Sequence, residues 1–151
     1  MTALDHLDWV ILELLQTNAR MPFSEIGRQV GLSQPAVAER VRRLEAEGVI
    51  CGYHAEINTE LIGHPITAII RISTPGGIHS DRAAAHAASM REIIECHKVT
   101  GSDCFVMKVL VKSIKHLESV IDQLSPFGTL NSSIVLDSPI KSRIFTEDSA
   151  R

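Results

Sequence analysis

The apolar residues of this chain change their period close to Gly48. From Leu7 to Gly48 they recur at spacings of three and four residues, which is the period of an amphipathic helix. From Val49 onward, β-branched runs alternate with shorter helical patterns. The sequence therefore predicts two modules, the first all-helical and the second built from strands and helices. A chain of 151 residues is long enough for two such small modules, each with a modest core.

Three helices are predicted in the first module. The first carries an apolar stripe and ends near Asn18, the second runs from Pro22 to Gly31, and the third runs from Ser33 to Gly48. Ser33 is a suitable N-cap, and glycine after a last helical turn is typical of a left-handed cap. Only three residues, Gly-Leu-Ser, connect the second and third helices. That length and chemistry predict a helix-turn-helix motif.

The third helix has one basic side. At about 100° per residue, Val37, Val41 and Leu44 face the core. The opposite side holds Pro35, Ala36, Glu39, Arg42 and Arg43, and Arg40 lies at the edge of the apolar arc. Residues 33–44 contain three arginines and one glutamate, a net charge of +2, although the whole chain has a net charge of −3. This side of the helix could dock in a DNA groove, because it combines small residues, Gln34 and the arginines. The alternative is an ordinary helix face that is exposed to solvent.

The second module shows the order β-α-β-β-α-β. Strands are expected in 65–74, 93–101, 103–113 and 132–138, helices in 80–90 and 113–128, and a possible fifth strand in 140–145. This order predicts a ferredoxin-like arrangement, in which both helices cover one face of an antiparallel sheet. The other face stays open, and a second copy of the chain is the simplest partner for its apolar residues.

The segment between the modules alternates in a strand-like manner. Residues 49–58 are interpreted as a connecting strand or as a wing beside the helices, and 58–65 as the end of a linker. The predicted organisation is therefore a helix-turn-helix domain in 1–52, a linker in 53–64 and a ferredoxin-like domain in 65–151. The fold class is α+β.

Several classes of protein are disfavoured. The chain has neither an apolar run of about eighteen residues nor a secretory leader, so we expect a cytoplasmic protein without a membrane segment. Cys51, Cys96 and Cys104 are scattered and favour small buried side chains over disulfides. A metal site of Cys96, His97 and Cys104 is conceivable, but neighbours on a strand point to opposite faces. No catalytic constellation or phosphate loop is found, so an enzyme is not expected.

Taken together, these segments resemble a known family. LDWVILELLQTNAR, GLSQPAVAERVRRLEAEGVICGY, VTGSDCFVMKVLV and SSIVLDSPIK resemble the Lrp/AsnC, or feast/famine, transcriptional regulators over nearly the whole chain. The resemblance implies a winged-helix-like DNA-binding domain followed by a ferredoxin-like effector-binding (RAM) domain. It also implies binding to double-stranded DNA, dimers that assemble further, commonly to octamers, and a small effector, often an amino acid. No other cofactor is expected.

The resemblance also implies site residues. The recognition helix would contact DNA through Ser33, Gln34, Pro35, Ala36, Glu39, Arg40, Arg42 and Arg43. The effector would be bound at the contact between dimers by Thr100, Gly101, Ser102, Asp103 and Cys104, with Ser132 and Ser133 as further polar contacts. Asp103 suits the ammonium of an amino acid, and the amides of Gly101 and Ser102 suit its carboxylate. This loop reads Gly-Ser-Asp-Cys, whereas many members of the family carry Gly-x-Tyr-Asp.

One enzymatic alternative remains. Siroheme decarboxylases resemble both modules and use histidines and arginines around a tetrapyrrole. This chain has histidines at positions 64, 79, 86, 97 and 116, but they follow no ligand spacing. A sequence-specific regulator is therefore the preferred interpretation, with a decarboxylase-like subunit as the alternative.

Overall fold

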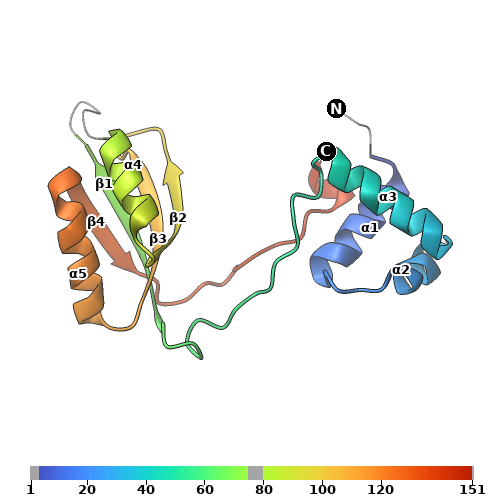
Figure 1. Cartoon of the computed structure of the whole chain (residues 1–151), viewed down its shortest axis with the longest axis horizontal. Coiled ribbons are helices and arrows are strands. Elements are labelled where there is room, and N and C mark those ends of the chain that lie inside the picture. The colour runs from blue at the N-terminus through green and yellow to red at the C-terminus, as the bar shows by residue number, and fades with distance from the viewer. Residues whose placement is uncertain (1–3, 75–79, 151) are drawn as a thin grey trace. The chain divides into compact units, whose positions relative to one another are not determined.

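The computed structural model of the chain describes residues 4–74 and 80–150. The described residues form two compact units (Figure 1). The first, which we call the helical unit, consists of residues 4–56 and 140–150. The second, the sheet unit, consists of the described residues between 57 and 139.

The helical unit contains three helices whose starts follow from local capping. These are α1 (His6–Thr17), α2 (Phe23–Val30) and α3 (Gln34–Ala46). Asp5 and Asp8 form a capping box at the start of α1, and Ser33 caps α3 by accepting from the backbone N–H of Ala36. Pro22 precedes α2 without a side-chain cap, so this helix begins one residue later than the sequence predicts. The buried core is formed by Ile11, Leu15, Ile26, Val37 and Val41.

Two glycines make the turn between α2 and α3 short. Gly31 ends α2 with a φ of 71°, in the left-handed region that glycine adopts without a Cβ penalty. Gly27 is buried under the turn, where an added Cβ would lie 2.5 Å from the carbonyl oxygen of Leu32. The backbone of the turn therefore packs directly on α2. The predicted helix-turn-helix is confirmed.

The sheet unit has the predicted β-α-β-β-α-β order. Its elements are β1 (Ile66–Ser73), α4 (Ser80–Ser89), β2 (Ile93–Lys98), β3 (Phe105–Val111), α5 (Ile114–Leu124) and β4 (Thr129–Ile134). The strand order is β2-β3-β1-β4, and every neighbouring pair is antiparallel. Helices α4 and α5 lie on one side of this sheet (Figure 1). The ferredoxin-like fold is therefore confirmed.

The two central strands separate a helix-covered face from an open face. Alternate residues of β1 and β3 are fully or nearly fully buried and pack with residues of α4 and α5, as the period of two requires. On the open face, Arg71 donates to Asn131 Oδ1 at 3.2 Å and to Ser133 Oγ at 3.4 Å. Lys108 Nζ on the same face lies 3.0 Å from Glu95 Oε1. This face therefore combines half-buried apolar side chains with paired polar ones.

The structure corrects two expectations about the segments that flank the sheet. Residues 49–58 form no strand, and residues 140–145 do not add a fifth strand to the sheet. The second segment instead packs on α1, where the Gln16 side chain donates to Phe145 O at 2.9 Å and accepts from Phe145 N at 2.8 Å. His6 Nδ1 lies 3.0 Å from Glu147 Oε2 in the same region. Residues 140–150 therefore lie in the helical unit, whereas the sequence prediction places them in its second domain, 65–151.

Candidate DNA-binding surface and effector loop

The first turn of α3 presents a surface suited to a groove. Ser33, Gln34 and Pro35 are exposed and Ala36 is half-buried. The turn contains no acidic residue, so the partial positive charge of the helix N-terminus is not offset there. Small side chains and an exposed amide allow the backbone to approach a polyanion closely. These four predicted residues therefore share one exposed end of α3.

Arg42 lies on the solvent side of the same helix. Its side chain is 69% exposed and pairs with Glu39, which is 74% exposed, one turn earlier. An ion pair between two exposed side chains contributes little to stability and is readily exchanged for another partner. The guanidinium of Arg42 is thus available to a phosphate.

The side chains of Arg40 and Arg43 point toward α1. The side chain of Asp8, on α1, is only 1% exposed, and each of its oxygens contacts a different arginine. Arg40 Nη1 lies 2.7 Å from Asp8 Oδ1, and Arg43 Nη2 lies 2.5 Å from Asp8 Oδ2. Arg40 Nη1 also lies 2.7 Å from Asp5 Oδ2. We call these four residues, Asp5, Asp8, Arg40 and Arg43, the Asp8 cluster.

The Asp8 cluster is electrically neutral and tightly bonded. The hydrogen bond from Arg40 lowers the pKa of the Asp5 carboxyl. In turn, hydrogen bonds to the carboxylates of Asp5 and Asp8 raise the pKa of Arg40. Two carboxylates therefore offset two of the three arginines that make α3 basic. Removing one partner of a fully buried pair costs about 3–5 kcal/mol, and we expect less here because both arginines are partly exposed.

Sequence reasoning missed the acidic half of this cluster. Asp8 lies on the buried stripe of α1, three residues before Ile11 and seven before Leu15. A carboxylate in an apolar stripe must find a cation, because an unpaired buried charge is strongly disfavoured. That pattern is the signal in the sequence, because Arg40, at the edge of the apolar arc of α3, is a suitable cation.

The predicted effector loop forms the tip of the β2–β3 hairpin. Val99 N donates to Cys104 O at 3.0 Å, and Cys104 N donates to Ile72 O at 2.7 Å, so the loop is closed at its base. Thr100, Gly101 and Ser102 are exposed, and Asp103 is half-buried. Their polar groups therefore gather on one exposed tip.

Cys104 is turned away from this tip. Its Sγ lies 3.1 Å from Thr74 Oγ1, and the side chain packs against the core of the sheet unit. Hydrogen bonding to the Thr74 side chain lowers the pKa of the Cys104 thiol. Cys104 therefore fixes the base of the loop against the end of β1, whereas the sequence prediction grouped it with the residues that line a pocket.

The strand register separates two further predicted residues. Ser132 pairs with Ile70, which faces the helices, and Ser133 pairs with Ile69, which faces the open side. The two exposed serines therefore lie on opposite faces of the edge strand β4, and their part in an effector site stays a prediction. Cys96 and His97 also lie on opposite faces, as expected, beside Met107 and Val106 respectively. Within residues 4–74 and 80–150, no three His, Cys, Asp or Glu side chains gather in a way that could hold a metal.

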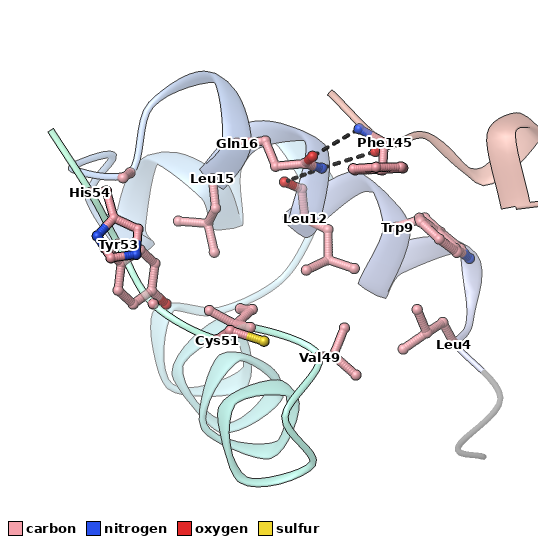
Figure 2. Close-up of a pocket in the computed structure, with 13 residues that line it drawn as sticks. Leu4, Trp9, Leu12, Leu15, Gln16, Val49, Cys51, Tyr53, His54 and Phe145 are labelled. Carbon is pink, nitrogen blue, oxygen red and sulfur yellow. Dashed lines mark hydrogen bonds between the residues drawn. The ribbon is translucent and has the colours of Figure 1, made fainter. Parts of the chain in front are cut away.

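Two hollows lie away from the predicted effector residues. One, of about 450 Å³, is in the helical unit between α1 and the segment that follows α3, with Trp9, Leu12, Leu15 and Phe145 among its mostly apolar lining (Figure 2). The other, of about 430 Å³, is in the sheet unit and includes His64, Arg91, Glu92, Lys112 and His116. Neither includes Thr100–Cys104 or the two serines of β4. In the described part of the chain, no helix has the length and apolarity needed to span a membrane.

Comparison with known proteins identifies both units. The AsnC-type helix-turn-helix domain matches residues 4–45, and the Lrp/AsnC ligand binding domain matches residues 67–145. The HTH-type transcriptional regulator YezC of Bacillus subtilis is 40% identical over 135 residues, which are 89% of this chain and 95% of that protein. The structure of Bacillus subtilis LrpC matches with a TM-score of 0.86 at 27% identity, covering 93% of this chain and 100% of that chain.

A second solved structure is a feast or famine regulatory protein from Mycobacterium tuberculosis complexed with L-methionine. It matches with a TM-score of 0.85 at 33% identity, and covers 94% of this chain and 99% of that chain. The chain therefore belongs to the Lrp/AsnC family of transcriptional regulators. Its α1–α3 region is the DNA-binding helix-turn-helix of that family, and its sheet is the core of the ligand-binding domain.

Proposed function

We propose that this regulator binds double-stranded DNA as a homo-oligomer and that an amino acid modulates this binding. The observation that carries the DNA contact is the exposed first turn of α3, with the exposed Arg42 two turns later. Gln34 is in a position to read base edges, and Glu39 to accept from a cytosine amino group. Arg42 is in a position to contact phosphate. Sequence preference then comes from Gln34 and Glu39, and salt-dependent affinity comes from Arg42.

The amino-acid effector is supported by the loop chemistry and by a relative. The relative from M. tuberculosis is a complex with L-methionine. In this chain, the half-buried carboxylate of Asp103 suits an ammonium, and the exposed amides of Gly101 and Ser102 suit a carboxylate. A second subunit would supply the wall that this exposed tip lacks.

Assembly is supported by the open face of the sheet and by the small positive charge of α3. Half-buried apolar side chains such as Ile69, Val106 and Leu110 remain on the open face, and a second copy is a suitable cover. Several copies acting together, up to an octamer of four dimers, would turn a weak single contact into firm binding. A regulator of this kind acts in the cytoplasm, and we assign it no catalytic step because the relatives reported above are regulators.

Fluorescence anisotropy tests this function. A labelled fragment from upstream of the gene for this chain is titrated with purified protein at two salt concentrations, with and without each standard amino acid, beside a scrambled fragment of equal length. We expect preference for the upstream fragment, weaker binding at higher salt, and a shift caused by one amino acid. The shift should disappear in Asp103→Ala. A folded protein that binds neither fragment at low salt would contradict the proposal.

A further inference from the structure

We propose that Asp8 is a positioning residue for DNA binding, because its buried carboxylate holds Arg40 and Arg43 against α1 and leaves Arg42 as the arginine of α3 that meets phosphate. The inference rests on the proposed DNA contact of α3. Of the three arginines that make α3 basic, two then bind a carboxylate of the protein itself, and only one is left to bind DNA.

The bonding of Asp8 is the first argument. Its carboxylate accepts from Arg40, from Arg43 and from the backbone N–H of Asp5 at 3.2 Å. Asp5 in turn accepts from the backbone N–H of Asp8 at 2.8 Å and from Arg40. A buried carboxylate with three donors satisfies the requirement that buried charges be paired and hydrogen-bonded. Moving either arginine to a phosphate would break this arrangement.

The spacing along α3 is the second argument. Arg40 and Arg43 are three residues apart and therefore lie on neighbouring parts of one helix side. Arg42 lies about 160° around the helix from Arg40, at about 100° per residue. The side chain of Arg42 is 69% exposed, whereas those of Arg40 and Arg43, which Asp8 holds, are 26% and 41% exposed. Two arginines on opposite oxygens of one carboxylate also restrict rotation of α3 about its axis.

The charge balance gives a measurable consequence. Each phosphate neutralised by a bound cation contributes about −0.9 to the slope of log affinity against log salt. If Arg42 alone of these arginines meets phosphate, the Asp8 cluster contributes nothing to that slope. Neutralising Asp8 would then release the guanidinium of Arg43 toward DNA, whereas Arg40 stays bonded to Asp5, and would add one positive charge to the helical unit.

The decisive variant is Asp8→Asn, which keeps the size of the side chain and removes its charge. We expect affinity for the scrambled fragment to rise about fivefold or more at 0.1 M salt, with a salt slope steeper by about 1. Preference for the upstream fragment should fall, because the released Arg43 favours any phosphate and α3 is less firmly oriented. The matched control is Glu13→Gln, on another side of α1, which changes the net charge equally without releasing an arginine.

A second pair of variants keeps the proposal testable if Asp8→Asn folds poorly. Arg42→Ala should reduce the salt slope by about 1, whereas Arg43→Ala should weaken binding by a similar factor at every salt concentration and lower Tm. A reduced slope in Arg43→Ala at an unchanged Tm would overturn the proposal. So would an Asp8→Asn variant that is folded and behaves like Glu13→Gln. Both outcomes leave the DNA-binding function intact, whereas a wild-type protein that binds no DNA contradicts both proposals.

Discussion

Gln34 is the exposed residue of α3 best suited to read bases. It lies in the first turn and carries both a donor and an acceptor, which can pair with the edge of adenine. Its position is set by the Ser33 cap and by the glycine turn, both of which are local features of the sequence.

Replacing Gln34 should therefore change specificity more than overall affinity. In Gln34→Ala, we expect preference for the upstream fragment over the scrambled one to fall by about 1–3 kcal/mol, with the salt slope unchanged. Anisotropy titrations on both fragments measure this difference. A uniform loss of affinity for both fragments would contradict the assignment of Gln34 to base contacts.

The capping carboxylate of Asp5 gives a second prediction for a single residue. Arg40 lowers its pKa in the folded protein below the ordinary value of 3.8. The Arg40 interaction therefore stabilises the fold above that value, and the contribution is lost as the pH falls through the lower folded pKa. We expect Asp5→Asn to lower Tm by a constant amount between pH 7 and pH 5, and by less below about pH 4. A Tm difference that persists undiminished at pH 2 would contradict this.

At the scale of elements, the helix-turn-helix depends on the contact between Gly27 and the turn. An alanine there would place its Cβ 2.5 Å from a backbone oxygen, which has no side-chain flexibility with which to move away. Gly31→Ala is the matched control, because its Cβ would meet no atom within 4 Å and only the left-handed conformation is penalised, by about 1–2 kcal/mol. We expect the larger loss of unfolding free energy in Gly27→Ala, measured by urea denaturation. Equal losses would indicate that the turn can shift.

The elements also show which structure can be predicted from the sequence. Ser33, Gly31 and the spacing of Val37, Val41 and Leu44 act within a few residues, so the pattern predicts α3 and its buried side directly. The partners of Arg40 and Arg43 lie 32 and 35 residues away, and periodicity on one helix carries no information about them. The sequence predicts a possible fifth strand in residues 140–145, but tertiary contacts with Gln16 decide where this segment packs.

At the scale of the molecule, the chain passes from the helical unit to the sheet unit and back again. Gln16 holds the returning segment through both backbone groups of Phe145 (Figure 2). We expect Gln16→Ala to accelerate hydrogen exchange at the Phe145 amide and proteolysis within 140–150, because those bonds are lost. Gln29→Ala, on α2, removes another exposed glutamine and should leave both rates unchanged. Slow exchange at Phe145 in Gln16→Ala would show that other contacts hold the segment.

This path of the chain has a consequence for biosynthesis. Residues 4–56 leave the ribosome first, and their partner segment 140–150 follows only after all of 57–139 has been made, on the order of ten seconds later. Until then, the Gln16 side chain has no Phe145 backbone to bond, and the apolar hollow in this unit lacks Phe145 from its lining. A product truncated before residue 140 would carry α1–α3 in this unfinished form. The DNA-binding unit is thus completed only on a chain that has already made its ligand-binding sheet.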